Sequence, residues 1–178
     1  MLFRDNTAVI IVDFQNEWSR EGSPFYLGRA TLAAEKTRTL VHEAHQRKLP
    51  LFYTKIYLEE HFENAFSPVQ DRSNIHEKLP KLDVINVIEH YGWDPFFETT
   101  LDKALAEAGV EHLVIGGLAI NAGVRSCVES AVDRNFEVTL VEDCCSAKDS
   151  ETMQVTIEDL QMYRDIRVEV LRNFEDFL

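Results

Sequence analysis

The chain has 178 residues, of which 45% are hydrophobic and 28% charged, a composition typical of one ordinary globular domain. The formal net charge of -13 argues against a nucleic-acid partner, because phosphates repel an acidic surface. No run approaches the roughly eighteen apolar residues of a membrane helix, and the N-terminus does not resemble a signal peptide. We therefore expect a cytoplasmic protein with neither a membrane nor a nucleic acid as partner.

Apolar runs alternate along the chain with segments of helical periodicity. The first run stops at Asp13, Gly109 is expected to end one helix, and Ser150 is expected to cap another. The polar and aromatic stretch 57–81 is predicted to be a loop or lid near a site. Strands are predicted at residues 8–12, 49–53, 84–88, 113–115, 138–141 and 166–170, and helices at 31–47, 99–109, 122–134 and 150–163.

This alternation predicts a single domain over residues 1–178, a three-layer α/β sandwich with about six mostly parallel strands and helices on both faces. In such sheets, ligands bind beyond the carboxyl ends of the strands, near a switch in strand order. Asp13, His90 and the turn 117–123 each follow a different predicted strand. We expect these three features to meet at one edge of the sheet.

The most informative stretch is HLVIGGLAINAGVRSCVESAVDRNFEVTLVED, residues 112–143. A strand, a glycine turn and a helix N-terminus in this order aim several backbone N–H groups at one point. The stretch resembles the active-site motif of the isochorismatase-like hydrolases, a superfamily that includes nicotinamidases and N-carbamoylsarcosine amidases. Their fingerprint is G-x-x-T-x-x-C-V-x-x-T-x-x-D-A. Aligned from Gly117, it places Gly123 at the nucleophilic cysteine and Cys127 where the family usually has threonine.

Two further blocks carry the resemblance over nearly the whole chain. AVIIVDFQNEW is similar to the family's A-L-L-V-I-D-M-Q-N-D-F, which places Asp13 on the acid/base aspartate. NVIEHYGWDPFFETTL is similar to V-V-x-K-x-x-x-S-A-F-x-x-T-x-L, which places His90 on the family's lysine. Of the three catalytic positions, only the aspartate is retained.

The missing thiol decides which mechanism the resemblance implies. In the family's amidases a thiolate attacks a carbonyl carbon, and Gly123 offers no nucleophile for that step. True isochorismatases, which cleave a vinyl ether, also commonly have glycine here and need only proton delivery followed by water. The resemblance thus implies a hydrolase of a small carboxylate-bearing metabolite, with Asp13 as acid/base and no covalent thiol step. The competing interpretation of Asp13 is a turn aspartate at a strand end.

His90 and the turn after Gly117 are the other candidate parts of the site. Protonated His90 could bind a substrate carboxylate or share a proton with Asp13, although it lacks the permanent charge of lysine; it could also be a remnant of lost chemistry. Backbone N–H groups near Ala119 and Gly123 could hold an oxyanion. The resemblance implies a cis peptide bond before Ala119. The remaining substrate-binding candidates are Gln15, Trp18 and Tyr91.

Two alternatives remain open. The chain could be a catalytically silent family member that binds a small ligand or acts as an interaction module. It could also be an amidase that uses Cys127 as a displaced nucleophile, but Cys127 lies about 6 Å along the helix axis from Gly123, which favours a packing role. Restoring the family's thiol by Gly123→Cys would show whether the rest of an amidase site is intact.

No metal or other cofactor is expected. The region KIYLEEHFEN lacks the Asp-x-His of nicotinamidases, and His61 with Glu59 or Glu60 is interpreted as a solvated helical patch. Three cysteines without C-x-x-C spacing argue against a disulfide framework, and Cys144 and Cys145 are expected to be reduced apolar fillers just past a strand. The expected partners are a small-molecule substrate and, because family members are usually dimers or higher, further copies of the chain.

Overall fold

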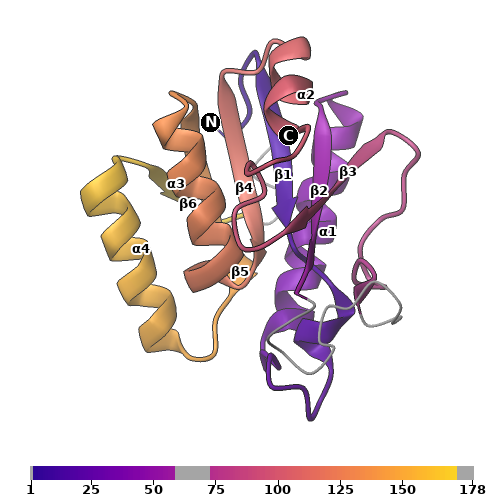
Figure 1. The fold of residues 1–178 in the computed structure, drawn as a ribbon, viewed down its shortest axis with the longest axis vertical. Coiled ribbons are helices and arrows are strands. Elements are labelled where there is room, and N and C mark those ends of the chain that lie inside the picture. The colour runs from indigo at the N-terminus through magenta and orange to yellow at the C-terminus, as the bar shows by residue number, and fades with distance from the viewer. Residues whose placement is uncertain (1, 59–72, 172–178) are drawn as a thin grey trace.

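The computed structural model describes residues 2–58 and 73–171. Within these ranges six strands form one sheet in the order β3-β2-β1-β4-β5-β6, and all neighbouring strands run parallel. Helix α1 packs on one face of the sheet, and α2, α3 and α4 pack on the other (Figure 1). The predicted three-layer α/β sandwich is confirmed.

The elements keep the predicted order, although several bounds differ. The strands are β1 Thr7–Val12, β2 Leu51–Tyr57, β3 Ile85–Tyr91, β4 His112–Leu118, β5 Glu137–Ser146 and β6 Arg167–Glu169. The helices are the 3-10 helix η1 Asn16–Ser19, α1 Ala30–Gln46, α2 Leu101–Glu107, the π-helical η3 Ile120–Val124, α3 Arg125–Asp133 and α4 Ser150–Arg164. No helix in the described ranges is long and apolar enough to cross a bilayer.

Strand β1 shows why a continuous apolar run forms the centre of this sheet. Its alternate residues face opposite sides, so Val9 and Ile11 pack in the core beneath α1 while Ala8, Ile10 and Val12 pack in the core beneath the other helices. All six residues of the strand are buried. A polar residue in the middle of β1 would therefore lie in one of the two cores.

Strand order changes direction at β1. The chain builds outward from β1 through β2 to β3, then returns to place β4 on the other side of β1. This switch point lies between the carboxyl ends of β1 and β4, where open α/β sheets bind ligands. The backbones approach closely there: a Cβ on Gly117, whose φ is +143, would lie 2.1 Å from the carbonyl oxygen of Val12. Only glycine fits this position.

Three predicted strand ends were wrong, because backbone pairing continues past the apolar runs. Gly116 and Gly117 lie within β4 and not in a turn, His90 lies within β3, and the adjacent cysteines Cys144 and Cys145 lie within β5. Parallel ladders depend on main-chain groups, so polar and small residues continue a strand when their neighbours pair.

The helix α4 begins at Ser150 as predicted, but its N-cap was placed one residue late. Asp149 caps this helix, and its carboxylate accepts the N–H of Thr152 at 2.8 Å, whereas Ser150 is the first helical residue. Gly109 follows α2 with a φ of +64, as expected of a residue that ends a helix. Most of the predicted loop, with Glu59, Glu60 and His61, lies outside the described residues.

A buried histidine lies at the amino-terminal edge of the sheet. His112 Nδ1 is 2.9 Å from the Thr7 hydroxyl, and its Nε2 is 2.9 Å from the Thr139 hydroxyl. The Thr7 hydroxyl oxygen also accepts the backbone N–H of Arg4. Burial, with the charge of Arg4, lowers the pKa of His112 to about 4. His112 is therefore a neutral, structural imidazole.

Candidate active site

Asp13 leaves the end of β1 with its carboxylate tied to two neighbouring strands. Its φ of 47 turns the chain sharply, and its Oδ1 lies 2.6 Å from the hydroxyl of Thr54 on β2 and 2.7 Å from Nε2 of His90 on β3. All three side chains are buried. The structure thus brings together the two residues that the sequence placed at separate strand ends, and it adds a third.

Thr54 was not identified from the sequence. Its hydroxyl oxygen accepts the backbone N–H of Asp13 at 3.0 Å, so the hydroxyl proton is directed at Oδ1 of the same residue. A hydroxyl in the otherwise apolar part of LFYTKIY was the available signal, but only the strand register places it beside Asp13. Thr54 therefore fixes both the backbone and the carboxylate of Asp13.

Gly123 lies directly against the second carboxylate oxygen. Oδ2 of Asp13 is buried and has no hydrogen-bond partner among the described residues. A Cβ added to Gly123 would be 2.5 Å from this oxygen and 3.4 Å from Cγ1 of Val12. The carboxylate therefore occupies the space that a side chain at position 123 would need.

The pKa of the His90 ring is shifted from its ordinary value by the surroundings. Burial lowers the pKa of His90, but the negative charge of Asp13 and the hydrogen bond to it outweigh burial, so the pKa lies above the ordinary value of 6.5. The charged imidazolium therefore persists to a higher pH than in a free histidine. When protonated, His90 places a positive charge against Asp13, at the position that the resemblance aligned with the family's lysine.

Substitution of Thr54 tests whether its hydrogen bonds to Asp13 influence the Asp13–His90 pair. Thr54→Val removes the hydroxyl at nearly constant volume, so the Asp13 carboxylate loses one donor and is expected to attract the imidazolium proton more strongly. We expect the pKa of His90, measured by NMR titration of its ring, to rise in Thr54→Val and to stay at the wild-type value in Thr54→Ser. Loss of the acceptor for the Asp13 N–H should also cost about 1–3 kcal/mol of unfolding free energy. Identical titrations in all three proteins would contradict this role.

Cys127 lies in the core beneath α2, α3 and α4 and has no exposed surface. Burial, followed by the charges of Asp13 and Asp94, raises the pKa of the Cys127 thiol well above its ordinary value. A reactive cysteine needs the opposite environment, one that is accessible and stabilises the thiolate. These properties fit the packing interpretation of Cys127.

Gln15 and Trp18 lie next to Asp13 but direct their polar groups at backbone. The Gln15 amide donates to the carbonyls of Ile56 and Ser73 and accepts the N–H of Ile56, which ties β2 to the segment after residue 72. The Trp18 indole N–H donates to the carbonyl of Asp13 at 2.8 Å, and its ring is buried. Both residues therefore support the turn that carries Asp13.

Tyr91 and Ala119 are the two remaining substrate-binding candidates, and the structure places them differently. Tyr91 is 64% exposed and contacts Tyr57 on the face of the sheet opposite His90, because successive strand residues point in opposite directions. The structure therefore does not bring Tyr91 together with His90. Ala119 is buried after a cis peptide bond, as the resemblance implied, and its carbonyl accepts the N–H groups of Ala122 and Val124.

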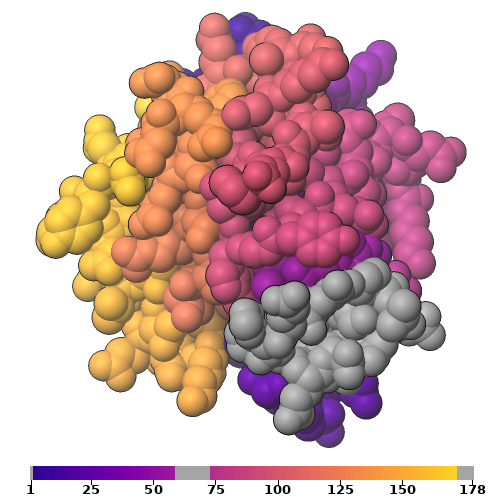
Figure 2. All heavy atoms as spheres, in the orientation of Figure 1, coloured from indigo at the N-terminus to yellow at the C-terminus, as the bar shows by residue number. Residues whose placement is uncertain are grey.

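Atoms of α3 and of the chain between β3 and α2 form the surface at the centre of the view in Figure 2. Three cavities of about 420, 430 and 530 Å³ open elsewhere, and their lining does not include Asp13, His90 or Gly123. The described residues also contain no group of three or more potential metal ligands.

Fold and site together define an α/β protein with a candidate acid/base pair at the switch point of a parallel sheet. The family model for the isochorismatase domain matches residues 7–168. Bacillus subtilis YddQ, an uncharacterized isochorismatase family protein, is 29% identical over 153 residues, which are 86% of this chain and 82% of that protein. The ureidoacrylate amidohydrolase RutB of Acinetobacter baylyi is 27% identical, over 79% of this chain and 71% of that protein.

The fold is shared with solved structures. The crystal structure of an isochorismatase family protein from Desulfovibrio vulgaris matches with a TM-score of 0.89 and 19% identity, over 98% of each chain. The chain therefore belongs to the isochorismatase family of hydrolases.

Proposed function

We propose that this family member hydrolyses a small carboxylate-bearing metabolite by general acid/base catalysis, without a covalent thiol intermediate. The observation that carries the proposal is the buried Asp13–His90 pair, joined at 2.7 Å, beside a residue that has no side chain. The family's acid is retained, its cation is replaced by a histidine whose pKa is raised, and its nucleophile is absent.

In this mechanism the two carboxylate oxygens of Asp13 have different roles. Oδ1 is held by Thr54 and His90, which leaves Oδ2 as the atom that exchanges a proton with substrate. The imidazolium of His90 stabilises the carboxylate when the proton has left it. Water then adds to the protonated substrate and gives a proton back to Oδ2, and the bond to the leaving group breaks. Backbone N–H groups near Ala119 and Gly123 hold an oxyanion of the substrate during these steps.

A substrate panel with a cysteine variant tests the absence of a thiol step. We expect one class among carboxylate-bearing vinyl ethers, amides and ureides to be hydrolysed at equal rates by the wild type and by Cys127→Ala. Intact-mass spectrometry during turnover should show no adduct on the protein. An adduct on Cys127, or loss of turnover in a folded Cys127→Ala protein, would exclude the proposed mechanism.

Full burial of the pair favours a second candidate, the catalytically silent member that binds a small ligand. Asp13 has no exposed surface, and its Oδ2 contacts Gly123 where a substrate atom would have to enter. This candidate predicts no turnover of any panel member, together with a rise in melting temperature with one of the carboxylates. Hydrolysis of a single panel member would exclude it.

A further inference from the structure

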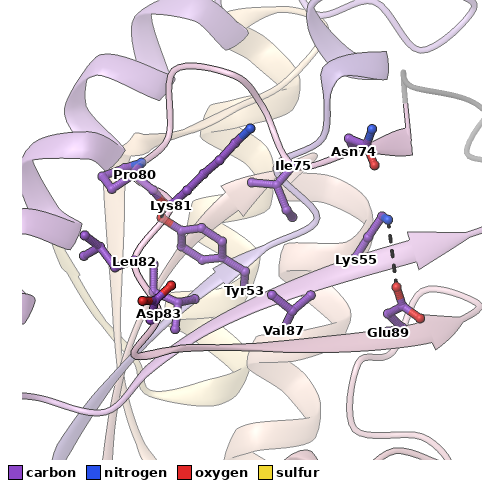
Figure 3. Close-up of a pocket in the computed structure, with 11 residues that line it drawn as sticks. Tyr53, Lys55, Asn74, Ile75, Pro80, Lys81, Leu82, Asp83, Val87 and Glu89 are labelled. Carbon is purple, nitrogen blue, oxygen red and sulfur yellow. Dashed lines mark hydrogen bonds and ion pairs between the residues drawn. The ribbon is translucent and has the colours of Figure 1, made fainter.

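The cavity of about 420 Å³ lies on the face of β2 and β3 that is opposite Thr54 and His90. It is bounded by the two strands and by residues 74–83 (Figure 3). Its lining is partly apolar and partly polar: one end presents Lys55 and Glu89, and Asn74, Lys81 and Asp83 also line it. The apolar wall is formed by Tyr53, Ile75, Leu82, Ile85 and Val87.

The charged end of this cavity is incompletely paired. Lys55 Nζ lies 3.9 Å from Glu89 Oε1, which is too long for a hydrogen bond, and the Lys55 side chain is only 14% exposed. Glu89 Oε1 accepts the hydroxyl of Tyr57 at 2.8 Å, and the Lys55 ammonium lies 5.0 Å from the centre of the Tyr57 ring. Within the described residues, the ammonium makes no hydrogen bond.

We propose that this cavity binds a free α-amino acid with an apolar side chain. The ligand carboxylate would accept from the Lys55 ammonium, its ammonium would donate to Glu89, and its side chain would lie against the apolar wall. The separation of the two protein charges suits this chemistry, because an α-amino acid carries its ammonium and its carboxylate on the same carbon atom. The cavity volume is in the range of small-ligand sites, about 300–1,000 Å³.

A ligand with only one charge would fit less well. A simple carboxylate would be attracted by Lys55 and repelled by Glu89, and a simple amine would experience the reverse. The site is separate from the proposed catalytic pair, because Lys55 follows Thr54 and Glu89 precedes His90 on strands whose successive residues face opposite sides.

Calorimetric titration of the full chain with three matched probes tests the proposal. L-Leucine carries both charges, 4-methylpentanoate lacks the amine, and 3-methylbutylamine lacks the carboxylate. We expect L-leucine to bind at least tenfold more tightly than either analogue. Lys55→Met should weaken L-leucine at least tenfold, whereas Glu89→Gln should bring L-leucine and 4-methylpentanoate to similar affinities.

Asp13→Asn is the control that separates the two sites. It should leave L-leucine binding unchanged, and this result does not depend on whether the protein hydrolyses any substrate. Absence of L-leucine binding, equal binding by wild type and Lys55→Met, or loss of binding in Asp13→Asn would each overturn the proposal.

Discussion

Replacing Asp13 with asparagine is expected to lower turnover of any hydrolysed substrate by on the order of 10²–10⁴-fold, the range that a positioned acid/base group contributes. Asparagine keeps the volume and the oxygen that accepts from Thr54, but it cannot exchange a proton with substrate. The pKa of His90 should fall as well, because burial lowers it and the opposing negative charge of Asp13 is removed. The measurements are steady-state turnover and NMR titration of His90.

Asp102→Asn provides the matched control for this substitution. It removes the same charge from an exposed carboxylate that is paired with Arg134 on the surface, far from any proposed chemistry. We expect turnover to be unchanged in this control. Turnover by Asp13→Asn within tenfold of the wild type would remove Asp13 from the mechanism.

Gly123→Cys, which restores the family's nucleophile, is expected to give no amidase activity. Its Cβ would lie 2.5 Å from Oδ2 of Asp13, a carboxylate that cannot move without losing Thr54 and His90. We expect a loss of about 1–3 kcal/mol in unfolding free energy, the usual effect of overpacking a buried site. The pKa of His90 should fall as its partner is displaced.

Gly123→Ala separates the steric effect from the thiol. It introduces the same Cβ without sulfur, so the two variants should show similar denaturant midpoints and similar His90 titrations. A Gly123→Cys protein that hydrolyses amides while His90 titrates as in the wild type would show that the carboxylate does not block position 123.

The proximity of Asp13 and His90 could be predicted because parallel-sheet geometry is simple. Asp13 follows one apolar run and His90 follows another, and carboxyl ends of parallel strands meet at one edge. The sequence could not show Thr54, whose contact with Asp13 depends on the register between β1 and β2. Nor could it show that the amide of Gln15 is saturated by backbone groups of β2 and residue 73.

The direction of side chains within a strand was the other reason why the predicted site differs from the observed one. Tyr91 follows His90 directly, so the two must face opposite sides once both lie in β3. The shorter predicted strand left Tyr91 in a loop, where either direction was allowed. The same rule separates Lys55 from Thr54, and with it the cavity beside Lys55 and Glu89 from the Asp13–His90 pair.

A fall in pH has opposite effects on the stability contributed by two histidines, which lie at the two ends of this sheet. His112 has a lowered pKa, so the stability that its neutral ring provides is complete above 6.5 and declines as the pH falls toward about 4. The contribution of His90 is complete below 6.5 and declines only as the pH rises through its higher folded pKa. A mildly acid medium thus keeps the stabilising contribution of His90 while it removes that of His112, so the folded state is most stable within a bounded range of pH.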